Sequence, residues 1–338
     1  MIKAVNDRLD ILASACDPRL SLFDIKVNEL SGETLRLSGR VLDASQVDKL
    51  RHFLSDTLTS LTTGLKMDTD AIKILRVPNL PKLSVATNLT GLYEKPTFGM
   101  PLSSELYFGT ELEVLEEKDG WVFTRQNDGY LGWAHGPYLT KTPISETHRV
   151  LAPSVEIRRE PNTTSEVLTR VVSGTGVVME KTKGEWSYII ANQTGWIPSA
   201  ALRPIKDIPQ SVDEKRKLLV EDSRRMIGVP YLWGGTSGNG IDCSGFVRLL
   251  HRWVGVGIPR DADLQCAAAR PVEEPFQIGD LFFFGEGESE RRVTHVGISL
   301  GGSTMIHSSR GRNGVYIDDV QKSDLLKKLY MSAGSFLR

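Results

Sequence analysis

The sequence is poor in cysteine, in net charge and in long apolar runs, and each shortage excludes a class of protein. Its 338 residues include three cysteines, an odd and sparse set that describes no disulfide framework and suits a reducing compartment. With 41 basic and 42 acidic residues the net charge is −1, so no basic field exists to hold nucleic acid or an anionic membrane. The apolar runs fall far short of the roughly 20 residues that span a bilayer.

The N-terminal residues also lack a feature, namely the apolar core of a secretory signal. We therefore expect a cytoplasmic protein, or a secreted one if a signal was removed from the sequence. A chain of 338 residues is too long for one ordinary core, so two to four domains are expected.

Residues 1–76 are predicted to form a small α+β module. Apolar and polar residues alternate on both sides of a turn at Ser31-Gly32-Glu33, which predicts a hairpin over residues 23–41. A helix capped by Ser45 follows, and a strand over residues 71–75 closes the module. Nothing in this segment indicates chemistry, so a docking or scaffolding role is expected.

A repeat follows a proline-containing linker. Its two copies, residues 80–142 and 148–206, have short alternating strands and glycine turns, the pattern of a small antiparallel barrel. Paired units of this kind resemble bacterial SH3-like domains, and their tryptophans are predicted to be core aromatics rather than ligand-stacking residues. The repeated points are Gly109-Thr110, Trp121 and Gly132-Trp133 in the first copy, and Gly174-Thr175, Trp186 and Gly195-Trp196 in the second.

The remaining segment, residues 211–338, contains the candidate nucleophile. A capping box at Ser211-Val-Asp-Glu214 opens a helix, and a glycine-rich loop then leads to Cys243, after which apolar residues recur at helical spacing. Cys243 is therefore expected at a helix start, where free N–H groups favour a thiolate, lower its pKa from about 8.5 and provide an oxyanion hole. Cys16 and Cys266 are expected to be inert structural residues.

Two histidines are candidates for the base and for the group that orients it. His295 and His307 lie in strand-like runs joined by Gly301-Gly302. If paired residue numbers sum to 602, His295 faces His307 directly, whereas a two-residue turn at the glycines would put the rings on opposite faces. We therefore expect a three- or five-residue loop or a bulge, and a triad of nucleophile, base and orienting residue.

Zinc is the alternative interpretation of one cysteine and two histidines, because three protein ligands can make a catalytic zinc site. The sequence has no tight ligand pair such as Cys-x-x-Cys or His-x-x-x-His. We expect neither a metal nor a cofactor.

These residues resemble the NlpC/p60 family of papain-like cysteine peptidases over about residues 220–335. With two SH3-like units in front, the chain is similar to γ-D-glutamyl-L-diamino acid endopeptidases. The resemblance implies Cys243 as nucleophile, His295 as base, His307 as orienting residue, and attack on the bond between D-Glu and a diamino acid. The matching pieces are Pro230-Tyr-Leu-Trp-Gly-Gly, Asp242-Cys-Ser-Gly-Phe, Ile258-Pro-Arg-Asp-Ala-Asp-Leu-Gln, Gly279-Asp-Leu-Phe-Phe-Phe, Thr294-His-Val-Gly-Ile and Met305-Ile-His-Ser-Ser.

The resemblance extends to cytoplasmic recycling enzymes, in which the first SH3-like unit covers the cleft and selects a free N-terminal L-Ala. It implies a wall-derived peptide, L-Ala-γ-D-Glu-diamino acid, as the partner. Glu105 and Tyr130 match the segments that supply this selection, while Tyr231, Asp242 and Ser244 are expected to line the same end. Glu105 could instead be a solvated strand charge and Tyr130 a barrel-core residue.

Three competing functions stay open at this point. A secreted wall hydrolase would use the SH3-like pair to hold peptidoglycan. A binding protein would contain an inactive catalytic domain, and an acyltransferase would use the same fold without hydrolysis. The expected fold class is multidomain α+β, with a papain-like catalytic domain after two small β-barrels and the N-terminal module.

Overall fold

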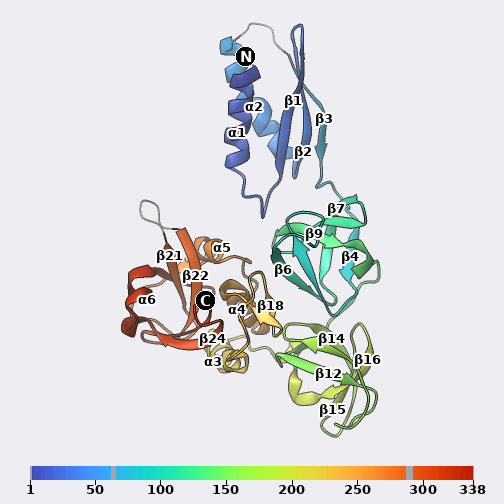
Figure 1. Ribbon diagram of the computed structural model, residues 1–338, viewed down its shortest axis with the longest axis vertical. Helices are drawn as coiled ribbons and strands as arrows, with labels where there is room; N and C mark the ends of the chain where they lie inside the picture. Colours follow the sequence, from blue (N-terminus) through green and yellow to red (C-terminus); the bar gives the residue numbers. More distant parts are fainter. Residues whose placement is uncertain (1, 62–65, 287–291, 338) are drawn as a thin grey trace. The chain divides into compact units, whose positions relative to one another are not determined.

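The structure, a computed structural model, describes residues 2–61, 66–286 and 292–337 (Figure 1). The chain divides into two units: residues 1–82 with 113–133, and residues 83–112 with 134–338. The segment predicted as the first barrel is therefore shared between the units. None of the helices within the described ranges is long and apolar enough to cross a membrane.

The N-terminal module is a three-stranded sheet covered by two helices (Figure 1). Antiparallel pairing joins the first two strands, and the third runs parallel to the second, as expected when a helix makes the crossover. The predicted hairpin is confirmed, whereas the first helix was not predicted. The elements are α1 (Ile2–Ser14), β1 (Phe23–Ser31), β2 (Thr34–Val41), α2 (Ala44–Leu61) and β3 (Lys66–Ile74).

The start of α2 differs from the prediction. The helix begins at Ala44, so Ser45 lies inside its first turn and is not the cap. Gln46 accepts a hydrogen bond from the backbone N–H of Asp43 at 2.8 Å, which is the return contact of a capping box. Asp43 therefore precedes the helix as its cap, and the prediction that Ser45 caps it is wrong by two residues.

A second hairpin belongs to the same unit as this module. It comprises residues 113–118 of β7 (Glu111–Lys118) and β8 (Trp121–Arg125), which pair antiparallel. Glu116 on this hairpin accepts hydrogen bonds from Arg40 at 2.7 Å and Lys73 at 3.2 Å, both from the N-terminal sheet. Trp121 is buried, as predicted, whereas its counterpart Trp186 is only partly buried, so the prediction of core tryptophans is confirmed for Trp121 but not for Trp186. The ion pairs of Glu116 fix the hairpin to the module.

The other unit begins with strands of the first barrel segment and a complete second barrel. Its apolar core includes Val150, Ile157, Val171, Val177 and Ile189. The strand order of the second barrel is β13-β12-β16-β15-β14-β11-β17. Apart from β7 and β8, the strands of the two barrel segments are β4 (Lys82–Val85), β5 (Leu89–Tyr93), β6 (Leu102–Tyr107), β9 (Leu131–His135), β10 (Leu139–Thr140), β11 (His148–Val150), β12 (Ser154–Arg158), β13 (Val167–Val172), β14 (Gly176–Lys183), β15 (Trp186–Ile190), β16 (Thr194–Pro198) and β17 (Leu202–Pro204). Residue 82 of β4 and residues 131–133 of β9 belong to the first unit.

The sequence repeat corresponds to a repeated turn. Gly109 and Gly174 both adopt positive φ, +78° and +87°, which glycine allows at no steric cost. The backbone N–H of Gly109 donates to the carbonyl of Val85 at 2.9 Å, and that of Gly174 donates to the carbonyl of Val150 at 2.9 Å. The same hydrogen bond therefore occurs at positions separated by 65 residues, which explains why glycine recurs there.

The C-terminal part of this unit is a six-stranded sheet with helices on both faces (Figure 1). Its strand order is β20-β25-β21-β22-β23-β24, and the pairs that form it are antiparallel. The elements are α3 (Val212–Ser223), β18 (Thr236–Ser237), β19 (Gly240–Ile241), α4 (Cys243–Trp253), α5 (Ala262–Ala268), β20 (Arg270–Pro271), β21 (Leu281–Glu286), β22 (Arg292–Gly301), β23 (Thr304–Ser309), β24 (Gly314–Asp319), α6 (Asp324–Leu329) and β25 (Tyr330–Ser335).

Strand β21 is buried on both sides. Leu281 and Phe283 belong to the apolar cluster that includes α4, whereas Phe282 and Phe284 belong to a second cluster that contacts α6. Successive side chains of a strand point to opposite faces, which explains why this strand is apolar throughout instead of alternating. The sheet is therefore the central layer, and α4 is held against one face of it.

Candidate active site

Cys243 is the first residue of α4, as predicted. Asp242 caps the helix by accepting a hydrogen bond from the backbone N–H of Gly245 at 2.6 Å. A Cβ atom on Gly245 would lie 2.3 Å from the carbonyl oxygen of Gly235, so the glycine-rich loop packs directly on the helix. Backbone N–H groups of Ser244 and Val296 reach the sulfur, which places it beside strand β22.

The prediction of a lowered Cys243 pKa is wrong for the free enzyme. Burial raises the pKa of this thiol to about 12, and the neighbouring Asp242 carboxylate acts in the same direction. The N–H groups of Val296 and Ser244 and the charge of Arg260 lower the pKa but do not compensate. The thiol is 7% exposed, so desolvation of the thiolate outweighs the helix start.

The two histidines form a hydrogen-bonded pair. His295 Nε2 and His307 Nδ1 lie 2.7 Å apart, and their rings meet edge to face. Ile298 pairs with Ile306, so the residue numbers of paired positions sum to 604 and His307 lies opposite Gly297. The shared face and the predicted bulge are confirmed, whereas direct opposition is wrong, because the rings meet diagonally.

Gly297 makes this diagonal contact possible. A Cβ atom at that position would lie 3.2 Å from His307 Cβ and 2.6 Å from Met305 Sδ. The absence of a side chain therefore leaves space on this face of the sheet for the two rings. Position 297 is a requirement of the site that sequence reasoning did not identify, although it lies within the matching piece Thr294-His-Val-Gly-Ile.

The protonation of the pair favours a neutral base. Burial lowers the pKa of His295 to about 3, and charge on His307 would lower it further. Burial also lowers the pKa of His307, against the opposing effect of Asp318. At neutral pH both rings are uncharged, so His295 is able to accept a proton.

Glu105 lies in β6 and contacts the loop that leads to Cys243. One carboxylate oxygen accepts a hydrogen bond from the backbone N–H of Thr236 at 2.7 Å. The side chain is buried, and this burial raises the pKa of Glu105. Hydrogen bonds from Thr236 and Ser237 and the charge of Arg260 oppose this rise without cancelling it. Glu105 is therefore a buried acid whose charge is offset only in part by its surroundings.

Asp242 forms a direct ion pair with the same arginine. Arg260 is 1% exposed and donates to both oxygens of the Asp242 carboxylate, at 3.1 and 2.6 Å. The same guanidinium donates to Ser244 at 2.9 Å and to Ser104, on β6, at 3.2 Å. Arg260 therefore links the start of the nucleophile helix to the barrel strand that carries Glu105.

Arg260 itself was not predicted as a site residue. It lies in the matching piece Ile258-Pro-Arg-Asp, where an arginine next to an aspartate gives no sign of burial. A buried ion pair stabilises a site only if further hydrogen bonds complete its geometry, as the two serines do here.

The two predicted tyrosines lie in different units. Tyr231 is half-buried, and burial together with the charges of Cys243 and Asp242 raises its pKa, which places the phenol near the predicted nucleophile. Tyr130 is buried in the unit that contains the N-terminal module, in a turn where its N–H donates to Asp128 at 3.1 Å. The substrate roles of both stay predictions.

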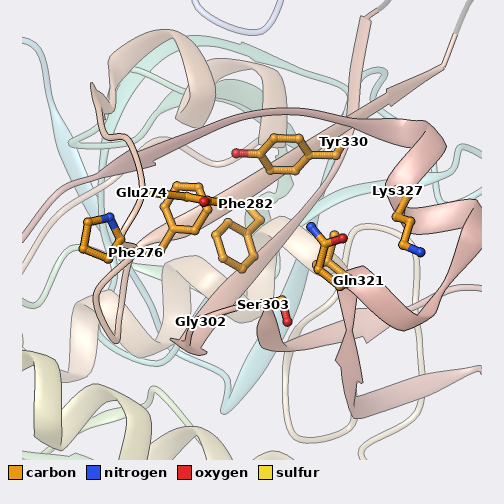
Figure 2. A pocket seen from close by; sticks show the side chains of 10 residues that line it. Glu274, Phe276, Phe282, Gly302, Ser303, Gln321, Lys327 and Tyr330 are labelled. Carbon is orange, nitrogen blue, oxygen red and sulfur yellow. The ribbon is translucent and has the colours of Figure 1, made fainter.

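Two other features of the structure bear on where chemistry occurs. Within the described ranges, no three His, Cys, Asp or Glu side chains are arranged to hold a metal ion. A cavity of about 720 Å³ opens on the face of the sheet opposite α4, where the rings of Phe282 and Tyr330 lie together (Figure 2). Its lining includes neither Cys243 nor the two histidines, so the cavity is separate from the candidate site. The residues that line it are Glu274, Pro275, Phe276, Phe282, Gly302, Ser303, Val320, Gln321, Lys327 and Tyr330.

A cysteine at the start of a helix, packed on an antiparallel sheet that carries two histidines, defines a papain-like cysteine peptidase. The model of the NlpC/P60 family matches residues 228–334, and the chain belongs to this family. The model of the bacterial dipeptidyl-peptidase Sh3 domain matches residues 92–135. The predicted enzyme class and the multidomain α+β fold are confirmed.

Several known proteins are similar to this chain. A γ-D-glutamyl-L-lysine dipeptidyl-peptidase of Bacillus cereus is 28% identical over 64% of this chain and 70% of its own. A probable endopeptidase of Corynebacterium glutamicum is 34% identical over 41% of this chain and 71% of its own. The crystal structure of an NlpC/P60 family protein from Bacillus cereus superposes with a TM-score of 0.65 and 23% identity, covering 76% of this chain and all of that one.

Proposed function

We propose that this chain hydrolyses the bond between the side-chain carboxyl of D-Glu and a diamino acid, diaminopimelate or lysine, in cell-wall stem peptides with a free N-terminal L-Ala. Relatives named γ-D-glutamyl-L-lysine dipeptidyl-peptidase support the bond. The requirement for a free amino end is supported by Glu105. An enzyme with this requirement acts on peptides already released from the wall, which corresponds to recycling in the cytoplasm.

The main observation in favour of a free amino end on the substrate is the balance of charges around Glu105. The buried groups are the carboxylates of Glu105 and Asp242 and the guanidinium of Arg260. With both acids ionised these three sum to one negative charge, and Arg260 is already paired with Asp242. Arg260 also acts on Glu105, but one cation balances only one of the two buried carboxylates. The remaining buried negative charge is costly, and one ammonium group would remove that cost. The N-terminus of a peptide supplies that ammonium.

Catalysis then follows from the neutral pair of thiol and imidazole. His295 accepts the proton of Cys243 as the sulfur forms a bond to the γ-carbonyl carbon of D-Glu, and N–H groups at the start of α4 stabilise the oxyanion. His295 returns the proton to the diamino acid amine as the C–N bond breaks, which leaves a γ-glutamyl thioester on Cys243. Water deprotonated by His295 attacks this thioester and releases the dipeptide L-Ala-D-Glu with its γ-carboxyl free, and His295 returns the proton to the sulfur, which restores the thiol.

Product analysis with matched peptides tests the proposal. L-Ala-γ-D-Glu-diaminopimelate and its N-acetylated form are compared with wild type, Glu105→Gln and, as control, Glu94→Gln, an exposed residue beyond β5. Losing a charge-assisted hydrogen bond costs about 1.5–3 kcal/mol, so kcat/KM should favour the free peptide about ten- to a hundred-fold in wild type and Glu94→Gln. Glu105→Gln should lose this preference.

The pH dependence of the preference provides an internal check. Burial raises the pKa of Glu105, and below that pKa the carboxyl is neutral and cannot attract an ammonium. The preference for the free peptide should therefore decline as pH falls, and should be flat in Glu105→Gln. Efficient digestion of intact sacculi by the wild type would instead identify a wall hydrolase. No cleavage of either peptide or of sacculi would favour a binding protein.

A further inference from the structure

The hydrogen-bond chain of the site extends beyond the two histidines. Asp318, near the end of β24, places one carboxylate oxygen 2.8 Å from His307 Nε2. Its other oxygen accepts a hydrogen bond from Arg312 at 2.7 Å, and the Arg312 guanidinium lies 4.1 Å from the centre of the Tyr316 ring. Asp318 thus lies on the strand next to the one that carries His307, and both of its oxygens have partners.

These contacts determine where the ring protons lie. An ionised carboxylate only accepts hydrogen bonds, so His307 Nε2 must carry a proton and donate it to Asp318. A neutral imidazole has one N–H, so His307 Nδ1 is an acceptor and the proton between the rings belongs to His295 Nε2. His295 Nδ1 is then the unprotonated nitrogen of the base. Asp318, two hydrogen bonds away, thus determines which nitrogen of His295 carries the proton.

We propose that Asp318 is a positioning residue that fixes His295 in the tautomer able to accept a proton at Nδ1, acting through His307. This inference rests on the proposed roles of Cys243 and His295. It differs from a purely structural role, because the tautomer and not only the ring position depends on the carboxylate. The orienting unit of the site is accordingly His307 together with Asp318.

Arg312 makes the substitution Asp318→Asn informative. Its guanidinium donates to one oxygen, so an asparagine would keep its amide oxygen towards Arg312 and turn its NH₂ group towards His307. His307 Nε2 would then have to accept, its Nδ1 would carry the proton, and His295 would be driven to the tautomer protonated at Nδ1. An aspartate-to-asparagine change that inverts a catalytic tautomer in this way costs about 10⁴-fold in kcat in a serine protease triad.

The experiment compares Asp318→Asn with Asp319→Asn in the full-length protein. Asp319 is the neighbouring carboxylate, and it contacts Ser303 and the N–H of Gln321 instead of a histidine. We expect Asp318→Asn to lower kcat at least about tenfold with little change in KM, and Asp319→Asn to stay near wild type. Nitrogen chemical shifts of His295 should change from the Nε2–H form towards the Nδ1–H form in Asp318→Asn only.

The same substitution in the variant His307→Asn distinguishes a positioning role of Asp318 from a purely structural role. In His307→Asn the side-chain oxygen can accept from His295 Nε2–H without help from Asp318. Asp318→Asn should therefore cost less than about twofold in that background, so the two effects are strongly non-additive. An equal loss in both backgrounds, or an unchanged His295 tautomer, would overturn the inference. The nitrogen shifts report on it even if the wild type does not cleave the proposed peptide, which would count against the proposed function alone.

Discussion

At the scale of single residues, the Cys243 thiol shows how burial and a helix terminus compete. A helix start offers unpaired N–H groups, and one of them, that of Ser244, reaches the sulfur together with the N–H of Val296 on β22. The side chain is nevertheless almost fully buried, and the carboxylate that caps the helix lies beside it. Both the raised pKa of Cys243 and the lowered pKa of His295 favour the uncharged pair. We therefore expect the proton to be transferred during attack on the substrate, not before it.

The rate of alkylation tests this protonation state. In the variant Cys16→Ala/Cys266→Ala only Cys243 can react, and its pKa of about 12 means that the thiolate fraction rises about tenfold per pH unit. The rate with iodoacetamide should therefore still be rising above pH 9, beyond the point at which an ordinary cysteine has levelled off. Cys243→Ala should neither react at this site nor turn over substrate. A rate that is constant from pH 6 to 9 would indicate a preformed thiolate–imidazolium pair.

Residue identities at the site could be predicted only where a motif carries them. Cys243, His295 and His307 lie in segments whose pattern is specific, and the structure brings the two histidines within hydrogen-bond distance. Arg260 and Asp318 were not predicted, because arginine and aspartate are common surface residues. Nothing in the sequence shows that Arg260 is buried or that Asp318 is hydrogen-bonded to a histidine. Long-range pairing of this kind depends on the tertiary fold.

At the scale of elements, α4 carries a buried imidazole near its C-terminal end, apart from the two histidines of the site on β22 and β23. His251 is fully buried, and its Nδ1 lies 2.8 Å from the carbonyl oxygen of Val247, one turn earlier. Its ring meets that of Phe336 edge to face. Burial lowers the pKa of His251 to about 4, so the helix is packed around a neutral ring.

The sign of the resulting pH dependence is fixed by that shift. The folded pKa of about 4 lies below the ordinary value of 6.5, so between these values the unfolded chain binds more protons than the folded one. The free energy of unfolding should therefore fall as pH decreases from about 6.5 to about 4, by roughly 3 kcal/mol for this residue. Urea titrations at several pH values measure this slope. His251→Phe should reduce this slope, and His295 and His307, whose pKa values are also lowered, account for part of what remains. Replacing the exposed His52 by Gln should leave the slope unchanged, and equal slopes in all three proteins would contradict the assignment.

Elements were predictable from periodicity, but their exact registers were not. The apolar spacing after Cys243 gave α4, and the capping box at Ser211 gave the start of α3. Helix α1 was missed because a short amphipathic N-terminal segment gives a weak signal until its apolar residues find the sheet. The register of the β22–β23 hairpin differed from the prediction because of the bulge between Ser299 and Gly301. This bulge changes the pairing by an amount that no local sequence pattern specifies.

At the scale of the whole molecule, the second barrel supports the site without contributing a site residue. Its turn at Gly174 is so close to its neighbours that a Cβ atom would lie 2.7 Å from Leu249, on α4, and 2.8 Å from the ring of Tyr107, on β6. The Tyr107 hydroxyl donates in turn to the carbonyl of Thr236, next to Glu105. The second barrel therefore packs against both α4, which carries the nucleophile, and β6, which carries the proposed ammonium-binding carboxylate.

Substitutions at two glycines of the second barrel distinguish the effect of this contact from the effect of backbone strain. Gly174 and Gly184 both have positive φ, so alanine strains either turn by about 1 kcal/mol or more, but nothing lies within 4 Å of a Cβ at Gly184. Gly174→Ala must also displace Leu249 or Tyr107 and should shift β6. We expect it to raise KM for the free stem peptide several-fold and to narrow the preference over the acetylated form. Gly184→Ala should lose a similar part of its thermal stability and keep wild-type kinetics, and matching kinetics in the two variants would leave the second barrel without influence on substrate choice.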